Sequence, residues 1–189
     1  MFMRTPRLTL RPGWAEDADE LAVAIAHRKV VHNLGRAPWP YALGDARAFI
    51  EAQQAERHGA SFLICSHEDG ACPIVGGIGF GPYENRPNEL GYWITPRAWG
   101  RGYATEAGHA AIAVARMLGV AELTAGHHVD NPASGAVLRK LGFASSGSAR
   151  RYSRGRGAWV DCTEYVLPLA SRRNAADSAV ATSSRLLAA

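Results

Sequence analysis

Hydrophobic residues recur along the chain with two different periods, which divide it into strands and helices. Near the start, Leu8 and Leu10 alternate with polar neighbours, and this alternation predicts a half-buried strand. Over about residues 16–27 the apolar positions lie three or four apart, which predicts a helix, and a second helix is expected to begin near Gly44 and Asp45. The first quarter of the chain is therefore expected to form a strand followed by two helices.

The middle and end of the chain return to strand patterns. Residues 61–65 and the glycine-rich segment 74–80 flank a turn near residue 70, which predicts a hairpin whose second strand packs closely or carries a bulge. Further strands are expected at 89–95, 122–129, 143–151 and 158–168, with helices at 101–118 and 132–141. This order predicts an α/β (α+β) fold with a mixed, mostly antiparallel central sheet of about seven strands flanked by about four helices.

The length and composition indicate a single folded domain. With 189 residues and 47% hydrophobic content, the chain is long enough for one core and short for two. We expect this domain at residues 5–169. The segment 170–189 is low in complexity and poor in core residues, so we expect a flexible or weakly helical tail without a catalytic part.

Charge and cysteine usage narrow the class of protein further. The net charge of +4 is mild and spread along the chain, which suits an anionic cofactor and does not by itself indicate nucleic-acid binding. Cys65, Cys72 and Cys162 are odd in number and lack a Cys-x-x-Cys pair, so we expect reduced structural thiols in a cytoplasmic protein. No signal peptide and no segment of about 18 apolar residues is visible, so we expect neither export nor membrane insertion.

The most informative stretch is residues 90–109, where a strand pattern passes through Gly-Arg-Gly into an alanine-rich helix. Gly100 and Gly102 allow an anion to approach bare backbone, and the helix start offers unpaired N–H groups and the positive end of the helix dipole. Arg101 adds a cation. The Gly-Lys-Ser/Thr ending of a nucleoside-triphosphate loop and the third glycine of a dinucleotide fingerprint are both missing. We therefore expect a pyrophosphate held mainly by backbone, without a metal ion.

This loop resembles the coenzyme A loop of the GNAT superfamily of acetyltransferases, Gln/Arg-x-x-Gly-x-Gly/Ala. The corresponding residues here are Trp99-Gly100-Arg101-Gly102-Tyr103-Ala104. Trp99 replaces the usual Gln or Arg, and in this it is similar to the RimJ/RimL branch, which commonly reads Trp-Gly-x-Gly-Tyr-Ala-Thr-Glu-Ala. Residues 5–12 and the block 131–143, which fits Asn-x-x-Ser-x-x-Val/Ile-Leu-x-Lys-Leu-Gly-Phe, also resemble that branch, so the likeness covers about residues 5–168.

The resemblance implies an acetyl-CoA-dependent N-acetyltransferase that passes the acetyl group directly to a primary amine, without an acyl-enzyme. The acceptor would be a protein N-terminus or a small-molecule amine. The backbone at Ile94 and Thr95 would pair with the pantetheine arm, and the loop N–H groups would hold the pyrophosphate. The cofactor-binding candidates are Ile94, Thr95, Trp99, Gly100, Arg101, Gly102, Tyr103, Ala104, Thr105, Asn131 and Ser134.

Two residues are candidates for proton transfer. An ammonium must lose a proton before it attacks a thioester, directly or through water. Alternation places Glu89 with Trp93 on one face of its strand, and the resemblance supports Glu89 as the base, since many family members place Glu on this strand. The alternative is a solvated carboxylate at the strand end. Ser134 is a candidate to protonate the departing thiolate, and Tyr103, Tyr152 or water could replace it.

Two other polar residues have structural alternatives. Asn131 precedes Pro132 and Gly142 follows ten positions later, which is the signature of a capped helix, while the resemblance adds a hydrogen bond to pantetheine. Glu106 could be catalytic, but a carboxylate in the first helical turn also interacts with the helix dipole, and we favour this structural role.

Other groups are weaker candidates. His127 and His128 are adjacent on a strand, so at most one is expected to face a site, and without a third ligand we expect no zinc. Arginines at 150–156 and the pair 139–140 could meet the 3′-phosphate or an acidic acceptor, although solvated faces are expected for most. The proline-rich loop 37–41 either forms a wall of the acceptor pocket or packs on the core.

Two rival functions remain open. One is a catalytically silent acyl-CoA-binding regulatory module that keeps the loop without a base. The other, a basic protein associated with ribosomes or nucleic acid, lacks an aromatic stacking motif, and we expect no direct nucleic-acid binding. The expected partners are acetyl-CoA and an acceptor amine, with no membrane and no metal, in a monomer or homodimer.

Overall fold

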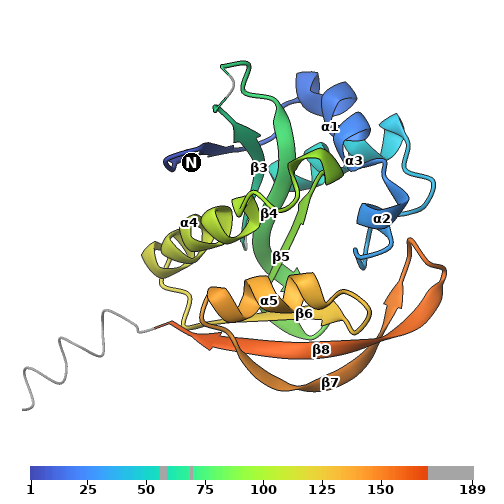
Figure 1. Ribbon diagram of the computed structural model, residues 1–189, viewed down its shortest axis with the longest axis vertical. Coiled ribbons are helices and arrows are strands. Elements are labelled where there is room, and N and C mark those ends of the chain that lie inside the picture. Colours follow the sequence, from blue (N-terminus) through green and yellow to red (C-terminus); the bar gives the residue numbers. More distant parts are fainter. Residues whose placement is uncertain (56–58, 69, 170–189) are drawn as a thin grey trace, which may run out of the picture.

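The computed structural model describes residues 1–55, 59–68 and 70–169; the predicted tail at 170–189 lies outside this range. Within it the chain forms one eight-stranded sheet and five α-helices (Figure 1). The strands are β1 (Met3–Arg4), β2 (Leu8–Arg11), β3 (Ala60–Ser66), β4 (Ile74–Tyr83), β5 (Arg86–Ile94), β6 (Glu122–His128), β7 (Ala144–Ser153) and β8 (Ala158–Pro168). The helices are α1 (Ala18–Ile25), α2 (Arg28–Val31), α3 (Leu43–Ala55), α4 (Tyr103–Met117) and α5 (Pro132–Lys140). The mixed fold is confirmed; the short β1 and α2 are the elements that periodicity did not reveal.

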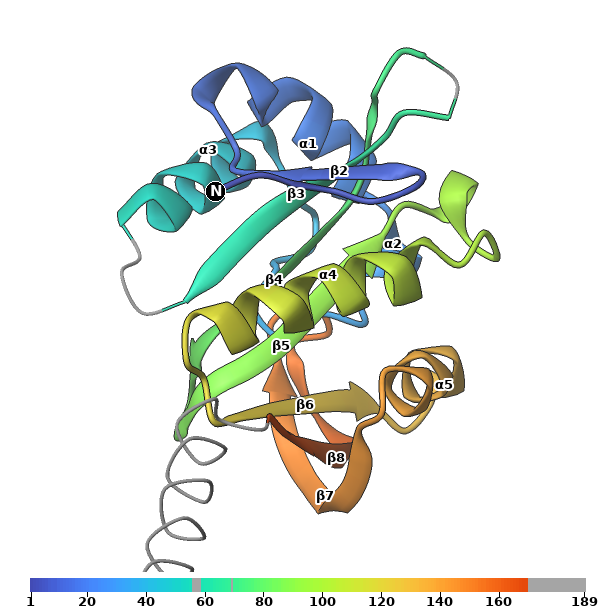
Figure 2. The same ribbon diagram turned by 90° about the vertical axis from the view of Figure 1, so that its left-hand side faces the viewer.

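The sheet is divided in its middle by its one parallel pairing. The strand order is β1-β2-β3-β4-β5-β6-β8-β7, and every neighbouring pair except β5 and β6 is antiparallel. These two strands are registered at Glu89 and Thr124 alone, and Figure 2 shows them running apart beyond that point. The connection between them is α4, as a parallel crossover requires. The divergence opens a split between the carboxyl ends of β5 and β6.

The helices cover two faces of the sheet (Figure 2), and they pack in two separate cores. One core joins α4 and α5 to Leu90 and Ile94 of β5, and the other joins α1, α2 and α3 to Trp93. The predicted alternation along β5 is therefore confirmed. It means that successive residues at the split face two different layers of the molecule.

Small residues let α4 lie close to the sheet. Ala107, Ala111 and Ala115 of α4 have no exposed surface, whereas Leu118, just after the helix, is 54% exposed. A Cβ added to Gly108 would meet the side chain of Leu141 beyond α5. The helix that begins at the glycine loop is thus fixed by close packing along its length.

Glycines in β4 make room for an aromatic side chain of β5. A Cβ on Gly77 would come within 2.6 Å of the Trp93 indole nitrogen, and one on Gly76 would meet the Trp93 carbonyl oxygen. The sequence prediction of close packing in this strand is confirmed. The register also shifts between Gly81 and Tyr83, where the pairing with β5 is irregular.

The cysteines are free and lie apart. Cys65 and Cys162 are buried and Cys72 is exposed. Burial raises the pKa of the Cys65 thiol to about 11, so it stays protonated near neutral pH. In the part of the chain that the structure describes, none of the helices has the length and apolar content needed to cross a bilayer.

Candidate active site

The loop before α4 adopts the backbone that the sequence predicted. Gly100 and Gly102 have φ values of 76° and 79°, in the left-handed region that side chains disfavour. Gly102 is the N-cap of α4. The first intrahelical hydrogen bond runs from the Glu106 N–H to the Gly102 carbonyl oxygen, at 3.1 Å. The N–H groups of residues 103–105 precede that bond and have no partner within the helix, so they can receive an anion.

Glu106 links this loop to the N-terminal segment of the chain through hydrogen bonds. Its carboxylate accepts hydrogen bonds from the Thr5 hydroxyl at 2.6 Å, from the Arg7 backbone N–H at 2.9 Å and from Arg7 Nε at 2.7 Å. The same arginine donates to the carbonyl oxygen of Arg101 at 2.8 Å. Burial alone would raise the pKa of Glu106, but the hydrogen bonds from Thr5 and Arg7 hold it below its ordinary value. These contacts support the structural interpretation of Glu106.

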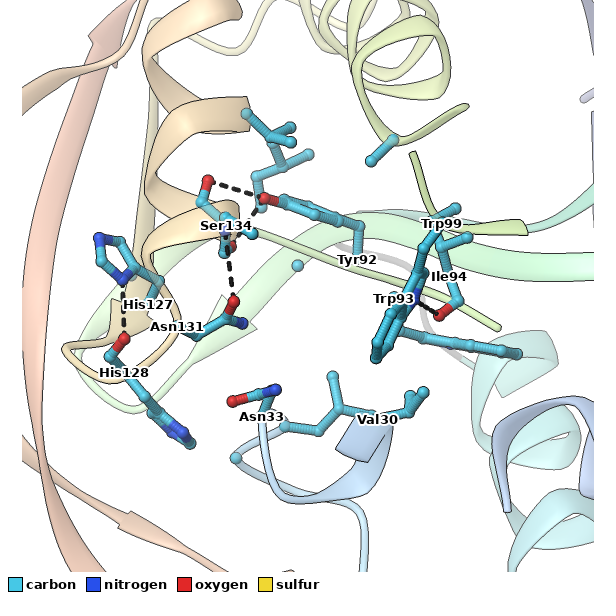
Figure 3. A pocket seen from close by; sticks show the side chains of 18 of the residues that line it. Val30, Asn33, Tyr92, Trp93, Ile94, Trp99, His127, His128, Asn131 and Ser134 are labelled. Carbon is cyan, nitrogen blue, oxygen red and sulfur yellow. Dashed lines mark hydrogen bonds between the residues drawn. The ribbon is translucent and has the colours of Figure 1, made fainter. Parts of the chain in front are cut away.

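A pocket of about 500 Å³ occupies the split between β5 and β6 (Figure 3). It extends from the start of α4 to the start of α5 and on to α2. All of the predicted cofactor-binding residues line it except Thr95 and Arg101, and so does Glu89. The structure thus gathers residues that lie far apart in sequence around one cavity.

Asn131 caps α5 and also faces the pocket. Its Oδ1 accepts from the Ser134 N–H at 3.4 Å, and Pro132 occupies the first helical position. At the other end Gly142 has a φ of 89°, and the Phe143 N–H donates to the Leu138 carbonyl at 3.1 Å. The capped-helix prediction is confirmed, and the cap leaves Asn131 and Ser134 beside the cavity (Figure 3).

Ser134 is paired with Tyr92, which sequence analysis did not single out. The Tyr92 hydroxyl lies 2.7 Å from Ser134 Oγ and donates to the Ser134 carbonyl oxygen at 3.1 Å (Figure 3). Burial raises the pKa of Tyr92 to about 12, although the Ser134 hydrogen bond opposes this, so the phenol stays protonated near neutral pH. The alternation that placed Leu90 and Ile94 on one face places Tyr92 there too, and this was the available signal.

Thr95 cannot take the role predicted for its backbone. Its N–H donates to the Val75 carbonyl at 2.8 Å and its carbonyl accepts from the Ala98 N–H at 2.9 Å. The neighbouring Ile94 carbonyl accepts the indole N–H of Trp99 at 2.6 Å. Trp99, the departure from the family pattern, therefore fixes the end of β5.

Two further predictions are wrong because an acidic side chain outside the pocket attracts both groups. The Tyr103 hydroxyl binds Glu68 and lies 3.1 Å from Ser66 Oγ, and neither of these partners lines the pocket. The Arg101 guanidinium pairs with Glu68 at 2.9 Å and does not line the pocket. Tyr103 is thus no proton donor, and Arg101 is left with its backbone as a contribution to the loop.

Glu89 faces the pocket as part of a buried ion cluster. Arg151 binds it with two nitrogens at 2.6 and 3.0 Å and binds Glu164 through Nε at 2.8 Å. Arg86 also lies within salt-bridge distance of both carboxylates. Arg151 is only 7% exposed and is an exception to the solvated faces expected for most of these cations, because two largely buried carboxylates require a buried cation.

Both histidines at the end of β6 line the pocket, so the prediction that at most one would is wrong. The reason is that the pocket passes through the split and reaches both layers: the His127 ring lies against α5, where a Cβ on Gly135 would meet it, and the His128 ring lies on the side of His32 and α2. His127 Nδ1 lies 2.8 Å from the His128 carbonyl oxygen, and the His128 ring is buried. Burial, followed by the charge of Arg156, lowers the pKa of His128, which favours the neutral ring. The described residues contain no cluster of three or more His, Cys, Asp or Glu suited to a metal.

The wall of the pocket opposite α4 comes from α2 and the residues after it. Lys29, Val30, Asn33 and Leu34 line the cavity there. No residue of the loop 37–41 does, and Ala37 and Tyr41 pack against the core of α1 to α3. The packed-loop alternative is the one that the structure supports.

Comparisons with known proteins identify the family. Residues 7–144 match the model of the acetyltransferase (GNAT) domain, and this chain belongs to that family of N-acetyltransferases. A curated relative, the uncharacterized N-acetyltransferase YoaA of Bacillus subtilis, is 27% identical over 172 residues, which cover 88% of this chain and 96% of YoaA.

Solved structures show the same fold. The ribosomal-protein acetyltransferase RimL in complex with coenzyme A superimposes with a TM-score of 0.76 at 19% identity, over 89% of this chain and 98% of RimL. The microcin self-immunity acetyltransferase MccE, in complex with acetyl-CoA and AMP, superimposes with a TM-score of 0.72 at 22% identity, over 87% of this chain and 94% of MccE. The structural neighbours therefore include ribosomal-protein acetyltransferases of the RimJ/RimL kind.

Proposed function

We propose that this protein transfers an acetyl group from acetyl-CoA directly to a primary amine, on a protein N-terminus or a small molecule. The observation that carries the proposal is the split between β5 and β6, which joins the anion-binding start of α4 to a cavity open to both layers of the molecule. Acetyl-CoA would enter from the α4 and α5 layer. The amine would arrive from the α2 layer and meet the thioester at the split.

The cofactor side offers backbone groups at each required position. The N–H groups of residues 103–105 would hold the pyrophosphate. Thr95 turns its N–H toward β4, and successive residues of a strand direct backbone groups to opposite sides, so the Ile94 N–H and the Tyr92 carbonyl face the split. These groups, together with Asn131, would bind the pantetheine arm. The MccE complex with acetyl-CoA supports this assignment by likeness of fold.

Changing Gly102 to valine is expected to weaken coenzyme A binding about 30-fold. A β-branched residue is strained at a φ of 79°, so the loop would rearrange, and one lost hydrogen bond to a charged group has an effect of this size. Isothermal titration with coenzyme A measures the change. The matched control is Gly119→Val at the other end of α4, where φ is 74° and an added Cβ meets nothing within 4 Å. Equal losses in the two variants would contradict the assignment.

On the acceptor side Glu89 remains the candidate for the base, acting directly or through water. It lies on the Trp93 face of β5, the face that α2 covers, and it lines the cavity. Arg151 orients it through two hydrogen bonds, and each carboxylate oxygen has a second lone pair for a proton. The tetrahedral intermediate would receive a hydrogen bond from a backbone N–H of β5.

Ser134 and Tyr92 together would protonate the departing thiolate. The two hydroxyls share a hydrogen bond at 2.7 Å on the cofactor side of the split. Because a coenzyme A thiolate leaves readily, Ser134→Ala is expected to lower kcat only about tenfold, less than the 10² to 10⁴ typical of proton transfer. Tyr92→Phe should have a similar effect, and the double variant should lose little more, since the pair acts as one unit. Steady-state kinetics of the three variants measure this, and unchanged turnover in Ser134→Ala would exclude the role.

The rival is a silent acyl-CoA-binding module. Such a module would bind coenzyme A in the same way as the proposed acetyltransferase, and it would differ only in catalysing no transfer. Coenzyme A binding without thiol release on any amine would favour it, whereas amine-dependent release would exclude it.

A further inference from the structure

A second hollow adjoins the main pocket between α2 and the start of α5. It has a volume of about 440 Å³ and shares Lys29, Asn33, Trp99 and Asn131 with the main pocket. Its other lining residues are Arg28, His32, Asp130 and Arg156. We call these eight residues the cationic groove. Because half of them also line the main pocket, a molecule bound at the split can extend into the groove.

The charges of the groove do not cancel. Arg156 binds Asp130 with two nitrogens at 2.6 and 2.9 Å, so the groove's one carboxylate is already neutralised. Arg28 and Lys29 are exposed, and among residues 1–55, 59–68 and 70–169 no carboxylate lies within salt-bridge distance of either. Within this part of the chain, two cations therefore stand without a carboxylate partner, and Lys29 lines both hollows.

A neighbouring imidazole responds to this positive field. Partial burial, followed by the charges of Arg28 and Arg156, lowers the pKa of His32. A neutral ring is favoured, so His32 adds no charge of its own near neutral pH. Glu89 in the main pocket does not offset the field either, because Arg151 is bound to both of its oxygens.

The α2 wall of the groove, which carries Arg28 and Lys29, lies on the layer from which the acceptor would arrive. Val30 and Val31 of α2 pack in the core that contains Trp93, whereas the start of α4 belongs to the opposite layer. The phosphates of coenzyme A would bind at that start of α4, in the opposite layer. We propose that the acceptor amine carries an anionic group, a carboxylate or a phosphate, and that Arg28 and Lys29 bind it. This inference rests on the proposed function and narrows its acceptor class.

Binding to the complex with coenzyme A tests the inference without requiring turnover. The peptide probes are Ala-Asp-Glu-Ala-Ala-Trp amide and its neutral match Ala-Asn-Gln-Ala-Ala-Trp amide; the small probes are phosphoethanolamine and ethanolamine. Isothermal titration is expected to show about tenfold tighter binding of the acidic member of at least one pair, as two exposed ion pairs provide, and a smaller difference at high salt. The pair that shows the preference tells whether the anion belongs to a peptide or to a small molecule.

The double variant Arg28→Ala/Lys29→Ala should abolish the preference. Its matched control is Arg4→Ala/Arg47→Ala, which removes the same charge from exposed positions outside the groove and should retain it. Equal binding of acidic and neutral probes to the wild type would overturn the inference. A second result would also overturn it: the Arg28/Lys29 variant binds coenzyme A more weakly than the wild type but binds 3′-dephospho-coenzyme A equally well. The two cations would then bind the 3′-phosphate of the cofactor instead of the acceptor. Failure of coenzyme A itself to bind would instead count against the proposed function.

Discussion

Replacing Arg151 with methionine is expected to lower the free energy of unfolding by about 3–5 kcal/mol, the range found when one partner of a buried ion pair is removed. Arg151 is 7% exposed and makes four close contacts, two with Glu89 and two with Glu164. Without it, both carboxylates would stay buried with only Arg86 nearby. Urea denaturation of the wild type and the variant measures the loss.

A compensating change separates lost charge pairing from lost packing. In the Arg151→Met background, Glu89→Gln removes one of the unpaired charges and should restore part of the stability, although the same change should destabilise the wild type. Two results would contradict this account: additive losses of unfolding free energy in the double variant, or a loss below about 1 kcal/mol in Arg151→Met alone. Either would show that the cluster is solvated, as an exposed ion pair is.

Glu89→Gln is expected to lower kcat about 100-fold, at the low end of the range for a general base. The loss should grow as the pH falls. Without a base the reaction depends on the neutral fraction of the amine, which decreases about tenfold for each pH unit below the pKa of the amine. Binding of acetyl-CoA should not change, because Glu89 lies on the opposite layer from the start of α4.

Glu164→Gln is the matched control for this experiment. Glu164 shares Arg151 with Glu89, and the two side chains are 9% and 11% exposed, but Glu164 does not line the pocket. Both variants should lose similar stability, while only Glu89→Gln should lose turnover and change the pH profile. Equal turnover in the two variants would remove Glu89 from the mechanism and leave it a structural role in the ion cluster.

The parts of the site that local sequence dictates were predictable. A glycine at a positive φ, an Asn-Pro helix start and the alternation along β5 are each determined by residues within a few positions of one another. The glycine loop, the α5 cap and the two faces of β5 were therefore foreseen correctly.

Contacts between distant segments were not predictable from local pattern. Arg151 and Glu89 are 62 positions apart, and nothing in the arginine-rich segment distinguishes the buried side chain from its solvated neighbours. Tyr103 was misjudged for the same reason, since Glu68, 35 positions away, holds its hydroxyl. The parallel pairing of β5 and β6 at one point, which opens the split, is likewise a property of the whole sheet.

Acceptor-dependent release of thiol from acetyl-CoA is the most direct test of the central claim. Purified protein would be assayed against a panel of N-terminal peptides, polyamines and amine antibiotics. Direct transfer predicts release with at least one class of amine, one thiol for each acetylated product, and no burst of thiol before an amine is added. Release on none of the amines, or a stoichiometric burst without an amine, would contradict direct acetyl transfer at this site.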